Sequence, residues 1–203
     1  YFGDEFHGVP VEYVEQEEQK GTAHAIGRVS EAVDEGFLAL NGDVLISEDI
    51  VERLVGVEEN AMTVMRVENP SSYGVVDVED GRITRIVEKP DDPPSNLANL
   101  GIYVFEPEVF DYIEATPESE RGEIEITDTI QSMIDDGYVF EATEYDDNGT
   151  WLDIGRPWEL LEANSAVLSN IDRRIDGEVE DGATVRGNVV VEQGARIRAG
   201  AYV

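Results

Sequence analysis

Aliphatic side chains recur at every sixth position near the end of the chain, and few folds can use such a spacing. They are Val179, Val185, Val191, Ile197 and Val203. A Gly or Asn follows each of the first four after three residues, at Gly182, Asn188, Gly194 and Gly200. A period of six fits neither an α-helix nor a simple strand, but it fits a hexapeptide parallel β-helix with Gly or Asn at the corners. Hairpins that share this period by chance are the alternative.

The residues before about 171 follow another pattern, in which strands alternate with helices. Apolar runs predict strands over 11–15, 37–40, 61–67, 74–78, 83–88, 100–105 and 139–145. Apolar residues at helical spacing predict helices over 25–34, 49–55 and 126–134, and Pro157 suits the first position of a last helix. This order is typical of an α/β domain with a mixed sheet. We therefore expect an α/β domain over residues 1–170 and the start of a β-helix over 171–203.

The chain is strongly acidic, with 46 Asp and Glu, 14 Lys and Arg, and a net charge of −32. Nucleic-acid binding and docking on anionic membranes need a basic surface, so neither is expected. No apolar run reaches the length of a membrane helix. Because only Lys20 and Lys89 are lysines, the composition is typical of a salt-rich cytoplasm, where screening weakens charge repulsion. The sequence has no Cys, which excludes disulfides and thiolate metal sites.

Polar residues follow several of the predicted strands. Asp43 comes just after the strand 37–40, where a carboxylate can hold Mg²⁺ beside phosphates, although Asn-Gly-Asp is also ordinary turn chemistry. Lys89 follows another strand, where it suits a phosphate or forms a surface ion pair with Glu88. Asp153 precedes the last helix and is either a second metal ligand or a helix cap. His24 is expected to be packed or solvent-facing rather than a catalytic base.

These segments, taken in order, resemble a known family. They read QEEQKGTAHAI (16–26), FLALNGDV (37–44), NPSSYGVV (69–76), VEKP (87–90), NLANLGIYVF (96–105), RGEIEITD (121–128) and WLDIGRPWELLEAN (151–164). The series resembles the sugar-1-phosphate nucleotidylyltransferases, among them glucose-1-phosphate thymidylyltransferase and N-acetylglucosamine-1-phosphate uridylyltransferase. It is most similar to the long archaeal form with a left-handed β-helix. The resemblance covers essentially the whole chain and implies a Rossmann-like mixed-sheet nucleotide-diphospho-sugar transferase domain, followed by the start of that left-handed parallel β-helix.

The resemblance also implies roles for particular residues. The pyrimidine base of the nucleotide would be read by Gln16, Gly21 and Thr22. Mg²⁺ would be coordinated by Asp43 and Asp153, which with Lys89 form the implied catalytic group. The sugar and its phosphate would be contacted by Gly74, Glu88, Lys89, Asn99 and Gly101, with Lys89 on the phosphate. Glu123 and Glu125 lie in a matching stretch, but the resemblance does not choose a role for them.

The implied reaction transfers a nucleotidyl group from dTTP or UTP to glucose 1-phosphate or N-acetylglucosamine 1-phosphate, and the sequence leaves base and sugar open. The family's Gly-rich triphosphate loop has no counterpart here. We therefore expect the 203-residue chain to be an internal piece of a longer protein and to lack turnover by itself. The longer protein would be cytoplasmic and homo-oligomeric, a trimer through its β-helix.

Two other functions remain open at this point. The β-helix could belong to an acetyl-CoA-dependent acetyltransferase in a bifunctional enzyme, since hexapeptide β-helices often serve acyl transfer. The chain could also be a non-catalytic sugar-nucleotide sensor. Retention of Asp43, Lys89 and Asp153 counts against the sensor.

Overall fold

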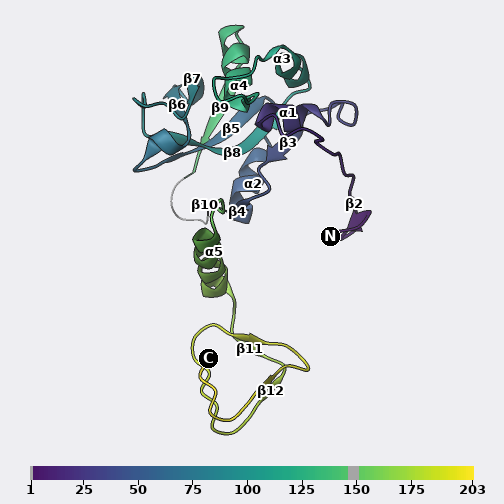
Figure 1. Ribbon diagram of the computed structural model, residues 1–203, viewed down its shortest axis with the longest axis vertical. Helices are drawn as coiled ribbons and strands as arrows, with labels where there is room; N and C mark the ends of the chain where they lie inside the picture. The colour runs from purple at the N-terminus through teal and green to yellow at the C-terminus, as the bar shows by residue number, and fades with distance from the viewer. Residues whose placement is uncertain (1, 146–150) are drawn as a thin grey trace. The chain divides into compact units, whose positions relative to one another are not determined.

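The computed structural model describes residues 2–145 and 151–203 (Figure 1). Contacts between Cα atoms divide the chain into two units. Unit 1 consists of Tyr1–Asn41 and Glu48–Asn148, and unit 2 consists of Gly42–Ser47 and Gly149–Val203. The domain boundary at residue 170 stays a prediction.

A six-stranded mixed sheet forms the centre of unit 1, with the strand order β3-β8-β5-β9-β7-β6. Its strands are β3 (Phe37–Leu40), β5 (Asn60–Arg66), β6 (Gly74–Glu79), β7 (Arg82–Glu88), β8 (Leu97–Phe105) and β9 (Phe140–Glu144). The β5–β9 pair is parallel, and the other neighbours are antiparallel. β8 is long enough to pair with β6 as well as with β3 and β5. The expected mixed sheet is therefore confirmed.

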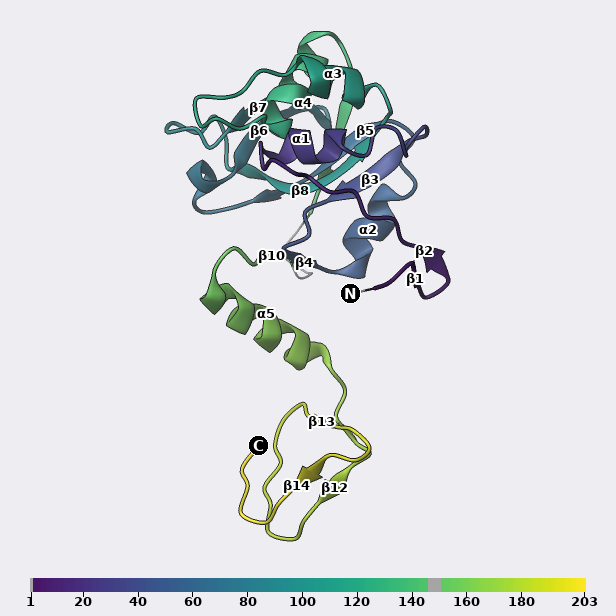
Figure 2. The same cartoon turned by 45° about the vertical axis from the view of Figure 1, so that its right-hand side comes forward.

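Three helices cover one face of this sheet. They are α1 (Thr22–Gly27), α3 (Val109–Ala115) and α4 (Ile126–Asp135). Their apolar side chains share one buried cluster with the strands, in which Ile130 and Met133 of α4 join Phe105 and Phe140 of the sheet. Helix α2 (Glu48–Leu54) lies on the opposite side of the sheet, as both cartoon views show (Figures 1 and 2). A short 3₁₀ turn, η1 (Pro70–Ser72), precedes β6.

Two local predictions near the start of the chain are wrong. Residues 11–15 form no strand, and the nearest strands are the short pair β1 (Glu5–Phe6) and β2 (Val9–Pro10). An extended segment becomes a strand only when a neighbour takes its backbone hydrogen bonds, and sequence pattern alone does not supply that neighbour. The helix predicted over 25–34 begins instead at Thr22 and ends at Gly27, after which the backbone forms tighter i→i−3 turns.

Unit 2 combines an antiparallel strand pair, a helix and short parallel strands. β4 (Val44–Ile46) pairs with β10 (Trp151–Asp153), and α5 (Pro157–Asn170) begins at a proline as predicted. β11 (Arg174–Ile175) runs parallel to β13 (Val190–Val191), and β12 (Glu178–Val179) runs parallel to β14 (Arg196–Ile197). Residues paired between β12 and β14 are eighteen apart, which equals three hexapeptides. In the described parts of both units, no helix is long and apolar enough to cross a membrane.

Candidate active site

Glu88 is the centre of a charged cluster in unit 1. It ends β7 opposite Gly74 of β6, and its carboxylate atom Oε1 lies 3.3 Å from Arg121 Nη1 and 3.5 Å from Lys89 Nζ. The Thr127 hydroxyl donates to the other oxygen, Oε2, at 3.3 Å. Two cations therefore meet at one carboxylate, which is unusual in a chain with so few basic residues.

Arg121 is surrounded by carboxylates. Besides Glu88, its guanidinium contacts Glu123 Oε2 at 3.4 Å and Glu125 Oε1 at 3.4 Å. Glu125 is only 4% exposed, and the Ser119 hydroxyl also donates to it. A buried carboxylate is costly unless it is paired, so the ion pair with Arg121 makes the position of each side chain depend on the other.

Gly74 packs closely against Glu88, Thr127 and Asn99. A Cβ atom at this position would lie 3.0 Å from Thr127 Cγ2, 3.3 Å from Glu88 Oε2 and 3.5 Å from Asn99 Cβ. Any larger residue would therefore press on Thr127, Glu88 and Asn99. Glycine at position 74 therefore keeps the strand backbone close to the Glu88 carboxylate.

Asn99 is held in place from two sides. Its Nδ2 donates to the Tyr103 hydroxyl at 2.6 Å, and its Oδ1 accepts from the Gly101 backbone N at 3.0 Å. Burial raises the pKa of Tyr103, so its hydroxyl stays neutral. Gly101 adopts a positive φ of 74°, and the Asn41 side chain occupies the place of a Cβ, so glycine is favoured at this position.

The segment predicted to read the base is tied to the start of α4. Gln16 Nε2 donates to the Gly21 carbonyl at 3.2 Å and to His24 Nδ1 at 2.8 Å. The Thr22 hydroxyl accepts from the Ile126 backbone N at 3.2 Å. Both hydrogens of the Gln16 amide nitrogen are therefore used inside the protein, which fixes the orientation of this amide.

Burial and neighbouring charge shift the ionisation of this cluster. Burial raises the pKa of Glu125 above its ordinary 4.5, and the charge of Glu88 raises it further, although Arg121 acts to lower it. Burial likewise raises the pKa of Asp128 above 3.8, with Glu88 adding to the effect. Burial alone would lower the pKa of Arg121, but Glu125, Glu88 and Glu123 outweigh it and raise the pKa. Arg121 therefore keeps its positive charge.

The free energy of unfolding is expected to decrease as pH rises through the raised pKa values of Glu125 and Asp128. Both carboxyls hold their proton more tightly in the folded chain, so their contribution is complete below their unfolded pKa values and is lost above the folded ones. Asp128→Asn should make the decrease smaller. Denaturant unfolding from about pH 4 to about pH 7 tests this, and an unchanged slope in the variant would contradict it.

Lys89 has a strained backbone. Its φ is +39°, a left-handed conformation that is unfavourable for a residue with a Cβ, and its backbone N donates to the Tyr73 carbonyl at 3.0 Å. Such strain often occurs at functional positions, where the surrounding structure holds the residue in place.

Lys89→Gly is therefore expected to stabilise unit 1 by about 0.5–1 kcal/mol, because glycine relieves this conformation. Asp80→Gly is the matched control, since Asp80 also has positive φ (+50°) but belongs to the turn between β6 and β7. Both variants should raise the urea midpoint. A lowered midpoint for Lys89→Gly would show that the strain is not relieved there.

The two aspartates predicted to bind metal are neighbours in unit 2. Asp153 ends β10 opposite Val44, and the Ile154 backbone N donates to the Asp43 carbonyl at 2.9 Å. Both side chains are exposed. Mg²⁺ usually takes one or two carboxylates together with water and substrate phosphates, so this pair fits the ion. Within residues 2–145 and 151–203, no three His, Asp or Glu side chains gather into a metal site made of protein ligands alone.

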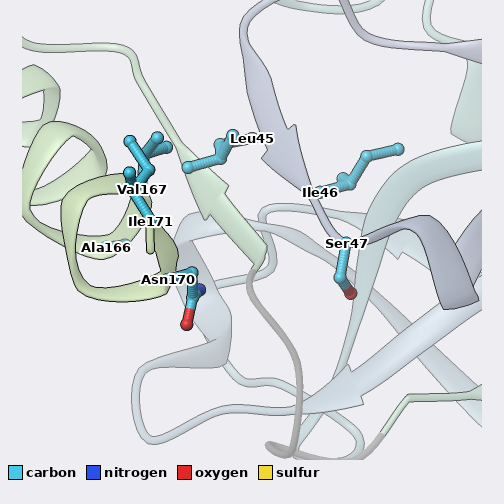
Figure 3. Close-up of a pocket in the computed structure, with 7 residues that line it drawn as sticks. All are labelled: Leu45, Ile46, Ser47, Ala166, Val167, Asn170 and Ile171. Atoms are coloured by element: carbon cyan, nitrogen blue, oxygen red, sulfur yellow. The ribbon is translucent and has the colours of Figure 1, made fainter. Parts of the chain in front are cut away.

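Unit 2 also has a cavity of about 290 Å³ (Figure 3). It is lined by Leu45, Ile46, Ser47, Ala166, Val167, Asn170 and Ile171. Figure 3 shows Leu45 directed toward Val167 of α5 and Ile171 just after it, while Ile46 points away from them. This mostly apolar lining does not suit a phosphate.

Eight of the ten predicted site residues belong to unit 1, where the segment 121–127 links them. It contacts Thr22 on the predicted base side and Glu88 on the predicted sugar side. Asp43 and Asp153 form the pair in unit 2. Sequence reasoning missed Arg121, Thr127 and Tyr103. A signal for Arg121 was available, because it is one of the few basic residues and stands beside two glutamates.

This chain is similar to known nucleotidyltransferases. The family model described as nucleotidyl transferase matches residues 1–170. A low-salt glycan biosynthesis nucleotidyltransferase, Agl11, from Haloferax volcanii is 40% identical over 93% of this chain and 54% of its own length. A bifunctional protein, GlmU, from Methanococcus maripaludis is 41% identical over 93% of this chain and 45% of its own length. The chain thus spans about half the length of the curated relatives it matches.

A solved structure is also similar to this chain. A protein assigned as a glucose-1-phosphate thymidylyltransferase from Bacillus anthracis, solved in complex with sucrose, superimposes with a TM-score of 0.67 at 33% identity. The match covers 78% of this chain and 65% of that protein. These relatives and this structural neighbour are sugar nucleotidyltransferases, and the Rossmann-like α/β fold expected from the sequence is confirmed. The chain belongs to the nucleotidyl transferase family.

Proposed function

We propose that the chain is the sugar-phosphate-binding and metal-binding part of a sugar-1-phosphate nucleotidylyltransferase. The observation that carries this proposal is the meeting of Lys89 and Arg121 at Glu88, where the backbone of Gly74 packs close to the carboxylate. A carboxylate accepts hydrogen bonds from sugar hydroxyls, and two adjacent cations suit a phosphate. A sugar 1-phosphate presents both groups on one small molecule.

The residues of unit 1 would position this substrate. Glu88 accepts hydrogen bonds from sugar hydroxyls, and Asn99, held by Tyr103 and Gly101, offers its remaining N–H. Lys89 and Arg121 neutralise the phosphate and direct one of its oxygens at the α-phosphorus of the nucleotide. That oxygen forms the new bond to phosphorus as pyrophosphate leaves. Catalysis of this kind rests on positioning and charge neutralisation and needs no covalent enzyme intermediate.

The nucleotide side of the proposal involves Gln16. Gly21 and His24 hold its amide nitrogen, so Oε1 remains to accept a hydrogen bond. The N3–H of uracil and of thymine is the matching donor, which supports UTP or dTTP and does not separate them. Asp43 and Asp153 would hold Mg²⁺. When bound, the ion would neutralise phosphate charge during the transfer.

Titration with the proposed product tests this function without requiring turnover. UDP-glucose and dTDP-glucose should bind the chain more tightly in Mg²⁺ than in EDTA, and Asp153→Asn should remove this difference. Glu162→Gln, on the exposed surface of α5, is the control and should keep it. Binding of neither sugar nucleotide, with or without Mg²⁺, would reject the proposal.

A second candidate comes from the end of the chain. We propose that residues 171–203 begin a left-handed β-helix through which the protein forms trimers and, in a bifunctional enzyme, transfers acetyl groups. The eighteen-residue offset between β12 and β14 supports the β-helix, and relatives named as bifunctional support the acetyltransferase. Acetyl-CoA binding by the complete protein would favour this candidate, and its absence would leave the β-helix an assembly element.

A further inference from the structure

Unit 1 has a second pocket, separate from the cluster around Glu88. Its volume is about 480 Å³, within the range of small-molecule sites. One wall comes from α1 and the residues just after it, and the other comes from α3. Phe110 and Ile113 of α3, together with Ile124, supply the apolar part of the lining.

The α1 wall offers two hydrogen-bond donors. The Gly21 carbonyl accepts from Gln16 Nε2, which identifies this atom as the amide nitrogen, so His24 Nδ1 must accept from it as well. The proton of a neutral His24 ring is therefore on Nε2, for which the described residues provide no hydrogen-bond partner. Arg28 lines the same pocket four residues later. Donors spaced in this way suit a phosphate or carboxylate group.

The α3 wall has the opposite charge. Asp111 and Glu114 line the pocket, and both are exposed. Among the described residues, Arg28 has no carboxylate within ion-pair distance, so neither Asp111 nor Glu114 already pairs with it. A ligand that carries both charges could satisfy both walls at once, whereas a simple anion would meet repulsion from Asp111 and Glu114.

We propose that this pocket binds a small zwitterion, with its anionic group at His24 and Arg28 and a protonated amine at Asp111 and Glu114. The pocket is also connected to the predicted base-reading segment. His24 holds Gln16, and the backbone of Ile124 accepts from Ala23 at 3.1 Å and donates to Lys20 at 2.6 Å. A bound zwitterion would therefore influence nucleotide affinity. Only this second effect rests on the proposed function.

Three related sugars separate the contributions of the two charges. Glucosamine 6-phosphate carries both charges, glucose 6-phosphate lacks the amine, and glucosamine lacks the phosphate. NMR titration should give glucosamine 6-phosphate an affinity about tenfold higher than either of the others. Its saturable shifts should appear at the ring of His24, which is readily observed because His7 is the only other histidine.

Substitutions locate the binding. Arg28→Gln should weaken glucosamine 6-phosphate by about tenfold, and Asp111→Asn should abolish its advantage over glucose 6-phosphate. Both residues are exposed, so both variants should fold. Lys89→Gln should leave the shifts that glucosamine 6-phosphate causes at the His24 ring unchanged, whatever its effect at the proposed substrate site. Equal binding of the three sugars, or binding lost in Lys89→Gln but kept in Arg28→Gln, would overturn the proposal.

Discussion

Gly21→Ala is expected to lower the free energy of unfolding of unit 1 by about 3 kcal/mol. Gly21 has φ +104°, and a Cβ there would lie 2.6 Å from the Ile124 carbonyl O and 2.8 Å from the Ile124 N. Both obstacles are backbone atoms, which cannot rotate away as a side chain can. The substitution therefore combines backbone strain, about 1–2 kcal/mol, with separation of the segment 20–23 from the residues before α4.

Gly137→Ala is the matched control for this experiment. Gly137 has a similar φ of +95°, but a Cβ there would meet nothing within 4 Å, so only the strain of about 1 kcal/mol is expected. Far-UV circular dichroism should be used in place of tryptophan fluorescence, because Trp151 and Trp158, the two tryptophans, both lie in unit 2 and would not report on unit 1. Equal losses in the two variants would mean that the contact with Ile124 contributes little.

Salt is expected to stabilise the chain strongly at neutral pH. A net charge of −32 on 203 residues creates self-repulsion, and raising KCl from about 0.1 M to about 1 M shortens the Debye length from about 10 Å to about 3 Å. The thermal midpoint should rise on the order of 10 °C, which corresponds to a few kcal/mol in a chain of this size. This result would support the proposed origin in a salt-rich cytoplasm.

The same salt series at about pH 5 is the control, because carboxylates that take up protons reduce the net charge. The increase in midpoint should be smaller there. If the increase is equal at both pH values, the stabilisation comes from salt-driven burial of apolar surface and not from screening of the carboxylates.

Periodicity predicted the elements whose apolar residues define one face. α4 and the strands of the mixed sheet formed where their patterns placed them, because burial of those faces is a local property of the sequence. The strand predicted over 11–15 was wrong, because a strand needs a neighbouring strand to pair with, and the apolar pattern of the segment does not show whether such a neighbour exists. The early end of α1 at Gly27 reflects a similar limit, since the apolar spacing continued beyond the point where the helical hydrogen bonds stopped.

The candidate site was predictable as a set of motifs and not as a set of contacts. Glu88 and Lys89 stood out because lysine is so rare in this sequence. Arg121 was missed although glutamates stand near it in the sequence, because only the fold brings Glu88 to it and joins the three carboxylates around one guanidinium. The support that Tyr103 gives to Asn99 is also invisible in sequence, since it depends on a buried hydroxyl at 2.6 Å.

Calorimetric titration with glucose 1-phosphate tests the central claim, that Glu88, Lys89 and Arg121 form a sugar-phosphate site. The account predicts saturable binding, at least about tenfold tighter than that of glucose, and a loss of about tenfold or more in Lys89→Gln. Lys20→Gln is the matched control, because the only other lysine is exposed and pairs with Glu18. Equal affinities for glucose 1-phosphate and glucose, or equal losses in the two lysine variants, would contradict the account.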